Sequence, residues 1–143
     1  MTVERMERVH LPFVAELERA CFSEPWSEKS LELLLTPDAL GVVGLRDGLV
    51  VAYGGILWAL DEGQITNVAV ASDARRQGNG RMIMEELIAS AKARGCVQIS
   101  LEVRASNEAA ITLYERLGFV VAGRRKRFYK APVEDALVMI LTL

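Results

Sequence analysis

Three strand-like runs in the middle of the chain limit its possible folds more than any other feature. The stretches ALGVVGLRDGLVVAYGGILWAL, residues 39–60, and GQITNVAV, residues 63–70, are apolar and rich in β-branched residues. The dipeptide Asp47-Gly48 interrupts the longer stretch, and such a dipeptide between apolar runs is a strong signal for a tight hairpin turn. The pattern therefore predicts three consecutive strands, of which the first two form a hairpin.

Helical patterns lie on both sides of these strands. Residues 6–22 place apolar side chains at close to helical spacing, and residues 27–35 predict a second, short helix that Ser27 caps. Beyond the strands, residues 78–94 are amphipathic and end in cations followed by Gly95, a common helix stop. The rest of the chain predicts a strand at 97–103, a helix at 107–117 and two strands at 119–129 and 135–143.

The order of these elements indicates the fold class. Two helices precede three strands, and a helix, a strand, a helix and two strands follow, with a further short strand possible at the N-terminus. Strands and helices mixed in this way predict an α/β (α+β) fold, in which a mixed sheet is flanked by helices. With 143 residues and 51% apolar composition, the chain is expected to form a single domain over residues 1–143.

Charge and cysteine content argue against several classes of function. The 17 basic and 19 acidic residues nearly balance, so no overall charge indicates a nucleic-acid binder. Cys21 and Cys96 lie far from a CxxC spacing and His10 is the single histidine, so we expect no metal site and no disulfide framework. No apolar run approaches the roughly 20 residues of a membrane span, and the first residues do not resemble a signal peptide. We therefore expect a cytoplasmic protein.

The stretch DARRQGNGRM, residues 73–82, joins a predicted strand to a predicted helix. Glycines allow a backbone to approach a ligand closely, and the free N–H groups of a helix N-terminus attract anions, so a phosphate group is a natural ligand. The stretch fits neither a P-loop, which needs a lysine after the glycines, nor a complete GxGxxG dinucleotide fingerprint. An ordinary turn with solvated arginines remains an alternative.

A second informative stretch is LEVRASNEAAITLYERLGF, residues 101–119. Glu102 lies near the C-terminal end of a predicted strand, where open sheets tend to bind ligands, and Tyr114 lies on the next helix. A carboxylate and a phenol beside one cleft can serve as a general base and a general acid. The alternatives are structural: Tyr114 continues an apolar stripe, Asn107 caps a helix, and Glu102 pairs with Arg104 or another cation.

Together, the stretches NVAV, RRQGNG and LEVRASNEAAITLYERLGF resemble the GNAT family of N-acetyltransferases, whose Q/R-x-x-G-x-G/A segment binds the pyrophosphate of acetyl-CoA. The stretches CFSEPWS and EDALVMIL narrow the resemblance to the RimI-type ribosomal-protein-alanine N-acetyltransferases, over nearly the whole chain. The resemblance implies a mostly antiparallel sheet of six or seven strands flanked by about four helices, with strands splayed at the acetyl-CoA site. One departure is Phe128-Tyr129, where members often carry two adjacent tyrosines.

The resemblance also implies roles for individual residues. Glu102 would act as the general base, directly or through a water, and Tyr114 as the acid that protonates the departing thiolate. Transfer would be direct, without an acyl-enzyme, and Cys21 and Cys96 would be spectators. The residues expected to contact acetyl-CoA are Val68, Ala69, Val70, Arg75, Arg76, Gln77, Gly78, Asn79, Gly80, Arg81 and Asn107.

The expected acceptor is the N-terminal α-amino group of a protein, most simply the terminal alanine of a small-subunit ribosomal protein. An α-amino group has a pKa of about 7.7–8.0 and a lysine one of about 10.4, so the terminal amine is far more easily deprotonated at neutral pH. An acetyltransferase for a lysine or a small amine is the alternative, and a non-catalytic acyl-CoA-binding module is a third. We expect no direct contact with nucleic acid or membrane, and a monomer or weak dimer.

Two charged segments can each be interpreted in two ways. Glu24 and Glu28 flank Pro25-Trp26 and could attract a basic peptide, or they simply belong to a solvated loop and helix start. The basic run from Arg124 to Lys130 either protects a sheet edge from pairing or meets CoA phosphates or an acidic partner.

Overall fold

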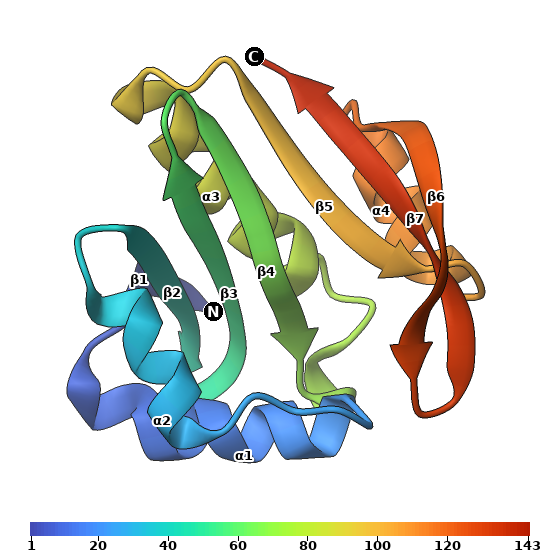
Figure 1. Cartoon of the computed structure of the whole chain (residues 1–143). Coiled ribbons are helices and arrows are strands. Elements are labelled where there is room, and N and C mark those ends of the chain that lie inside the picture. The colour runs from blue at the N-terminus through green and yellow to red at the C-terminus, as the bar shows by residue number, and fades with distance from the viewer.

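Seven strands form one sheet in the computed structural model, which describes all of residues 1–143 (Figure 1). The order across the sheet is β1-β2-β3-β4-β5-β7-β6, and every neighbouring pair is antiparallel except β4 with β5. The predicted mixed, mostly antiparallel sheet is therefore confirmed, including the short N-terminal strand. The strands are β1 (Thr2–Arg5), β2 (Ala39–Arg46), β3 (Leu49–Ala59), β4 (Glu62–Val70), β5 (Gln98–Arg104), β6 (Val120–Lys130) and β7 (Val133–Thr142).

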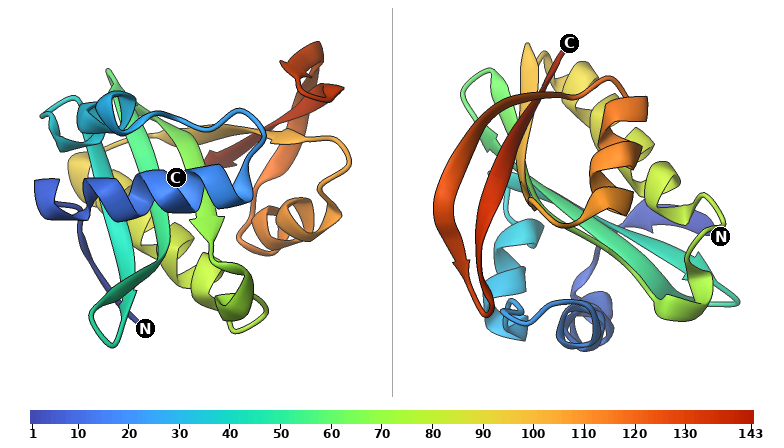
Figure 2. Two further views of the ribbon diagram at one scale, coloured as in Figure 1. Left: turned by 90° about the horizontal axis from the view of Figure 1, so that it is seen from below. Right: turned by 90° about the vertical axis from the view of Figure 1, so that its right-hand side faces the viewer.

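Four α-helices cover the two faces of the sheet, as expected (Figure 2). Helices α1 (Leu11–Cys21) and α2 (Glu28–Leu31) lie on one face, and α3 (Asn79–Arg94) and α4 (Glu108–Arg116) lie on the other. Each face has its own apolar core, and the fully buried side chains of α3 and α1 anchor the two helices to the sheet. No helix of the chain is long and apolar enough to cross a membrane.

The first two helices are shorter than their patterns predict. The helix expected from residue 6 begins at Leu11, because Pro12 lacks an N–H and is tolerated only in the first turn. His10 precedes it and closes a separate 3₁₀ turn by accepting the backbone N–H of Glu7 at 2.9 Å. The helix expected over 27–35 keeps its Ser27 cap but changes after α2 into a 3₁₀ turn, Glu32–Leu35.

The predicted hairpin turn is confirmed in its backbone conformation. Asp47 has a φ of 53° and Gly48 a φ of 77°, so both central residues of the turn lie in the left-handed region. A two-residue turn of this kind matches the twist of the strands that it joins, β2 and β3. The turn sets the pairing of Arg46 with Leu49 at the start of the β2–β3 ladder.

The two halves of the sheet separate between β4 and β5. The parallel pairing joins only Glu62–Gln64 to Gln98–Ser100, and beyond it the two strands diverge, as Figure 1 shows. On its other side, β4 contains a bulge: Ile65 pairs with Ile56 and Val68 pairs with Gly54, so two residues of β4 oppose Gly55 alone. The splayed strands expected from the resemblance are therefore present.

Candidate active site

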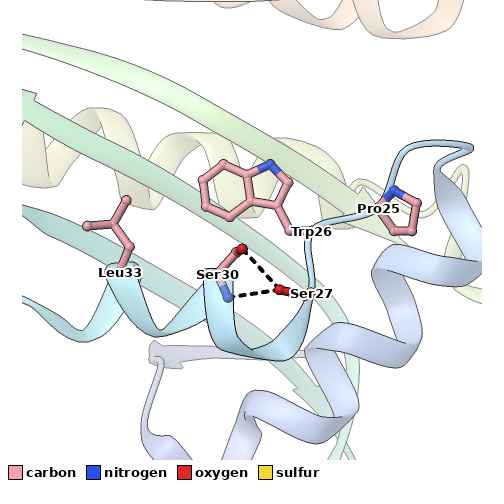
Figure 3. Close-up of a pocket in the computed structure, with 5 residues that line it drawn as sticks. All are labelled: Pro25, Trp26, Ser27, Ser30 and Leu33. Carbon is pink, nitrogen blue, oxygen red and sulfur yellow. Dashed lines mark hydrogen bonds between the residues drawn. The ribbon is translucent and has the colours of Figure 1, made fainter. Parts of the chain in front are cut away.

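Two hollows on the surface are candidate sites. One lies over α2 and is lined by Pro25, Trp26, Ser27, Ser30 and Leu33 (Figure 3). Its polar groups are the indole N–H of Trp26 and the two serine hydroxyls, which are 3.0 Å apart and hydrogen-bonded, so it offers no acid or base. The other is a cavity of about 740 Å³ between the diverging ends of β4 and β5, and it holds the titratable groups.

This larger cavity brings the predicted catalytic residues together. Glu102 reaches it from β5 and Tyr114 from α4, and Asn107 lies at the start of the same helix. Phe128 and Tyr129 of β6 close the cavity on the far side. The sequence separates these groups by up to 27 residues, and β5, α4 and β6 together place them around one cavity.

Glu102 is held by a single weak ion pair. Its Oε1 lies 3.6 Å from Nε of Arg125, whose side chain is 59% exposed, and Arg104, considered as a partner from the sequence, does not contact it. An ion pair that is exposed on one side is worth little, about 0–1 kcal/mol. The carboxylate is therefore largely free to accept a proton from a molecule in the cavity.

Tyr114 combines a core position with access to the cavity. Its ring packs against Phe119 with centroids 5.9 Å apart, and only 9% of the residue is exposed. Burial raises the pKa of the Tyr114 hydroxyl to about 12, and nearby Tyr129 adds to the shift. The group is thus a neutral proton donor throughout the physiological range.

Asn107 serves as the cap of α4. Its Oδ1 accepts the backbone N–H of Ala110 at 3.2 Å, so the capping interpretation of the sequence is confirmed. The residue also lines the cavity, and a contact with CoA stays a prediction.

The glycine loop before α3 has the shape of an anion site. Gly78 has a φ of +78°, and a Cβ built there would meet nothing within 4 Å, so open space lies above the backbone. An internal hydrogen bond holds the loop in place: Asn79 is buried, and its Nδ2 donates to the carbonyl of Ala74 at 2.8 Å. The N–H groups of the first turn of α3 have no partner inside the helix, and Arg76 and Arg81 beside them are exposed, a setting that favours phosphate.

The arginines of this loop do not all point in one direction. Arg75 turns back toward β4, where its Nε donates to the carbonyl of Val70 at 3.0 Å and its Nη2 lies 3.6 Å from Sγ of Cys21. Arg81 pairs with Glu85 on α3 at 3.6 Å. Arg76 makes no side-chain contact within the fold that would compete with a ligand.

Substitution of Gly78 tests the anion site. Gly78→Val is expected to raise the KM for acetyl-CoA about tenfold or more, because the side chain enters the open space and the left-handed backbone costs roughly 1–2 kcal/mol. Gly48→Val is the matched control, since Gly48 has a φ of +77° and equally open surroundings in the β2–β3 turn. Steady-state kinetics with varied acetyl-CoA would separate them. An equal KM in both variants would remove the loop as the phosphate site.

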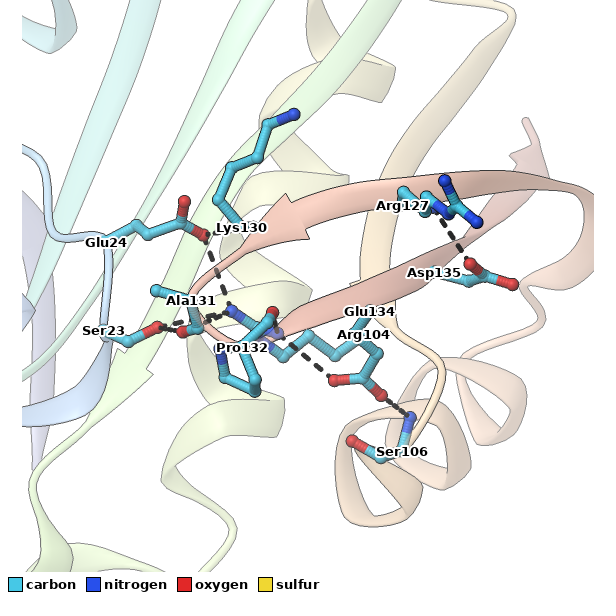
Figure 4. Close-up of polar contacts among 10 residues, drawn as sticks. All are labelled: Ser23, Glu24, Arg104, Ser106, Arg127, Lys130, Ala131, Pro132, Glu134 and Asp135. Atoms are coloured by element: carbon cyan, nitrogen blue, oxygen red, sulfur yellow. Dashed lines mark hydrogen bonds and ion pairs between the residues drawn. The ribbon is translucent and has the colours of Figure 1, made fainter.

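A network around Arg104 joins two loops over the cavity (Figure 4). Its guanidinium donates to the carbonyls of Ala131 and Pro132 at 3.2 and 3.0 Å and to Oγ of Ser23 at 3.3 Å. It also pairs with Glu24 at 3.5 Å, and the ring of Tyr129 lies under it at 4.3 Å. The loop between α1 and α2 is thereby tied to the β6–β7 turn.

Glu134 completes this network from β7. Its Oε1 accepts from Nη1 of Arg104 at 3.2 Å and its Oε2 accepts the backbone N–H of Ser106 at 2.7 Å. The hydrogen bond from Ser106 and the Arg104 guanidinium hold the pKa of Glu134 below its ordinary value. The carboxylate therefore stays ionised and keeps its hold on the guanidinium.

Removing the guanidinium should loosen the two loops. Arg104→Met is expected to raise the KM for a peptide substrate about tenfold, since several hydrogen bonds of about 1 kcal/mol each are lost, while the KM for acetyl-CoA changes little. Arg124→Met is the control, because it removes only the exposed 2.8 Å pair with Asp135. Limited proteolysis within residues 22–27 should accelerate in the first variant alone. Unchanged peptide kinetics would contradict a role for this tie in substrate binding.

One buried acid was missed in the sequence. Glu18 of α1 is fully buried, and its Oε1 accepts from the hydroxyl of Tyr53 and from Nδ2 of Asn67, the latter at 2.7 Å. Burial raises its pKa, and the hydrogen bonds from Tyr53 and Asn67 oppose the shift. A signal was available: Glu18 lies four residues after Val14 on the apolar face of α1, where a charged side chain has to be buried.

The sequence is similar to proteins of one known family. Residues 11–119 match the family model described as the acetyltransferase (GNAT) family. The [ribosomal protein bS18]-alanine N-acetyltransferase of Escherichia coli strain K12 is 38% identical over 99% of this chain and 97% of its own length. The Haemophilus ducreyi protein of the same name is 32% identical over 90% of both chains.

Solved structures agree with these sequence matches. The crystal structure of the ribosomal-protein-S18-alanine N-acetyltransferase from Escherichia coli superposes with a TM-score of 0.92, at 38% identity, over 99% of this chain and 92% of that one. The structure of Ard1 from Thermoplasma volcanium gives a TM-score of 0.91 at 22% identity, over 99% and 97% of the two chains, and so shares the fold. The overlap covers every strand that borders the cavity.

Proposed function

Since this chain belongs to the acetyltransferase (GNAT) family, we propose that it transfers the acetyl group of acetyl-CoA to the N-terminal alanine of ribosomal protein bS18. The observation that carries the proposal is the 38% identity to the Escherichia coli enzyme of that name, which extends over 99% of this chain and 97% of the relative. The presence of both Glu102 and Tyr114 in one cavity supports a catalytic protein over a binding module.

The reaction needs a neutral amine and a protonated leaving group. An α-amino group with a pKa of about 7.7–8.0 is partly neutral at physiological pH, so a base of modest strength suffices. Glu102 accepts the proton that the amine loses as the N–C bond forms, directly or through a water. Tyr114 donates its hydroxyl proton to the sulfur as the C–S bond breaks. No acyl-enzyme is required, and the cysteines take no part.

Acetyl-CoA is the acyl donor of this family, and the geometry fits it. Beyond Gln64, the β5-facing side of β4 has no ladder partner in β5, so the outward-facing peptide groups of residues 68–70 are available to a ligand, except the Val70 carbonyl, which accepts from Nε of Arg75 at 3.0 Å. The glycine loop and the start of α3 offer N–H groups and cations for the pyrophosphate. The residues assigned to acetyl-CoA remain those expected from the sequence: 68–70, 75–81 and Asn107.

The acceptor peptide would reach the cavity between two loops. The N-terminus of bS18 would enter between the loop of residues 22–27, which borders the cavity, and the β6–β7 turn, which Arg104 ties to that loop. With a ribosomal protein as its substrate, the enzyme would act in the cytoplasm, as a single domain over residues 1–143. No group of three or more His, Cys, Asp or Glu side chains is arranged to hold a metal ion.

Mass spectrometry tests this function directly. A peptide with the N-terminal sequence of bS18 is incubated with acetyl-CoA and the protein, beside the same peptide with a blocked N-terminus and an added internal lysine. One acetyl group on the free N-terminus alone is the expected result. Acetylation of the blocked peptide would indicate a lysine acetyltransferase. If neither peptide reacts, a small amine becomes the acceptor to seek, and Phe128 is the first position to examine.

A further inference from the structure

Resting on the proposed acetyl transfer to a peptide N-terminus, we propose that the carboxamide oxygen of Asn67 accepts a hydrogen bond from the acceptor's α-amino group. Glu18 is the positioning residue that fixes the carboxamide for this contact. The proposal gives a role to a buried acid that the transfer mechanism does not use, and it adds a substrate-binding residue on β4 to those on β5 and α4.

The hydrogen bond to Glu18 determines which way the Asn67 carboxamide faces. Oε1 of Glu18 accepts from both the Tyr53 hydroxyl and Asn67, so only the NH₂ group of Asn67 can lie against it. The oxygen of the carboxamide therefore points away from Glu18.

That oxygen is open to the cavity. Asn67 is half-buried, lines the cavity, and makes no hydrogen bond through Oδ1 within the fold. The buried side-chain oxygens without a partner in this chain are Oε2 of Glu18 and Oγ1 of Thr66, so Oδ1 of Asn67 is not among the enclosed atoms. The protein thus presents a fixed, unused hydrogen-bond acceptor at the cavity wall.

The bulge in β4 explains why this side chain can reach both Glu18 and the cavity. Thr66 and Asn67 together oppose Gly55, so the alternation of side chains along β4 is interrupted at this point. Asn67 lies on the α1 side, just beyond Gln64, where the pairing with β5 ends. Without the extra residue, the alternation would place the carboxamide on the other face of the sheet.

The chemistry of this acceptor fits an amine. A neutral primary amine has one lone pair for the thioester carbon and two N–H groups. In the proposed contact, one N–H proton passes to Glu102 and the other N–H donates to Asn67 from the opposite wall of the cavity. A neutral amide oxygen accepts from an amine without binding a proton, so it orients the nucleophile without competing with the base.

Replacing Asn67 tests the contact. Asn67→Ala is expected to raise the KM for the peptide about five- to tenfold, the effect of one lost hydrogen bond, and to leave the KM for acetyl-CoA within about twofold. Asn67→Ser is expected to do the same, because its hydroxyl is too short to occupy the position of Oδ1, and it covers the case in which alanine weakens β4. Tyr53→Phe is the matched control. This change also removes a donor to Oε1 of Glu18, but Tyr53 does not line the cavity.

A double-mutant cycle tests the role of Glu18. A glutamine at this position can donate or accept, so Glu18→Gln allows the carboxamide to turn over and should raise the peptide KM severalfold. The same change in an Asn67→Ala background should have no further effect on the peptide KM. A purely structural role would add the two effects instead, and that result would overturn the positioning assignment.

The outcomes separate this inference from the proposed function. A wild-type protein that acetylates the peptide while both Asn67 variants keep its KM would overturn the Asn67 contact alone. A wild-type protein that leaves every peptide N-terminus unmodified would overturn the proposed function itself. A raised peptide KM in the Asn67 variants, with Tyr53→Phe unchanged, is the result that supports the contact.

Discussion

The variant Glu102→Gln is expected to lower kcat for peptide acetylation about 100-fold at pH 7, while the affinity for acetyl-CoA stays unchanged. General-base catalysis contributes about 10²–10⁴-fold, and the lower end applies here because the α-amino group is already partly neutral. The deficit should shrink as the pH rises through the amine's pKa of about 7.7–8.0. Initial rates from pH 6 to pH 9, with binding of acetyl-CoA measured separately, check both statements.

The control for this variant is Arg125→Ala. It removes the only ion pair of Glu102 but leaves the carboxylate in place, and the exposed guanidinium is replaced without creating a cavity. If Glu102 served only as a partner for Arg125, the two variants would behave alike. We expect Arg125→Ala to keep most of the activity. Wild-type turnover in Glu102→Gln would remove this residue as the base.

The variant Tyr114→Phe is expected to lower kcat about 100-fold or more, because only the proton donor to the leaving sulfur is lost. The ring would keep its contact with Phe119, so the melting temperature should change little. Tyr129→Phe provides the comparison, since Tyr129 is the other phenol in the cavity. If Tyr129→Phe were the inactive variant and Tyr114→Phe were active, the acid would have to be reassigned.

The raised pKa of Tyr114 also predicts the pH profile of the wild type. The protonated hydroxyl is the active form, and a pKa of about 12 keeps it protonated far into the alkaline range. An ordinary tyrosine, with a pKa of about 10, would be half ionised at pH 10. We therefore expect kcat to show no falling limb up to pH 10.5. A decline centred near pH 10 would indicate a more exposed phenol as the acid.

Local patterns predicted most of the secondary structure correctly. The turn at Asp47-Gly48, the cap at Ser27 and the stop at Gly95 each depend on a few adjacent residues, and each is present. The start of α1 was predicted wrongly because apolar spacing outweighed Pro12. The neighbours in the sheet, such as β7 between β5 and β6, depend on pairings between distant segments and could not be read from these patterns.

The residues of the candidate site were likewise predictable only where a local motif contains them. Glu102 and Tyr114 were found through their resemblance to a known motif, and the structure places both at one cavity. Asn79 was predicted to contact acetyl-CoA with the rest of the phosphate loop, but its side chain donates to the carbonyl of Ala74 within the fold. The Arg104 network joins Arg104 to Ser23, which lies 81 positions away, and the Glu18–Asn67 pair joins residues 49 positions apart. Spacing along the chain gives no indication of either contact.

The separation of β4 from β5 creates a strand edge inside the sheet. Its peptide groups beyond Gln64 have no partner in β5, whereas the same strand is bonded to β3 on its other side. Amide protons of such an edge should exchange with deuterated solvent faster than those of the adjoining ladder, and a bound ligand that pairs with them should slow the exchange. Occupancy of the site can thus be followed residue by residue without any turnover.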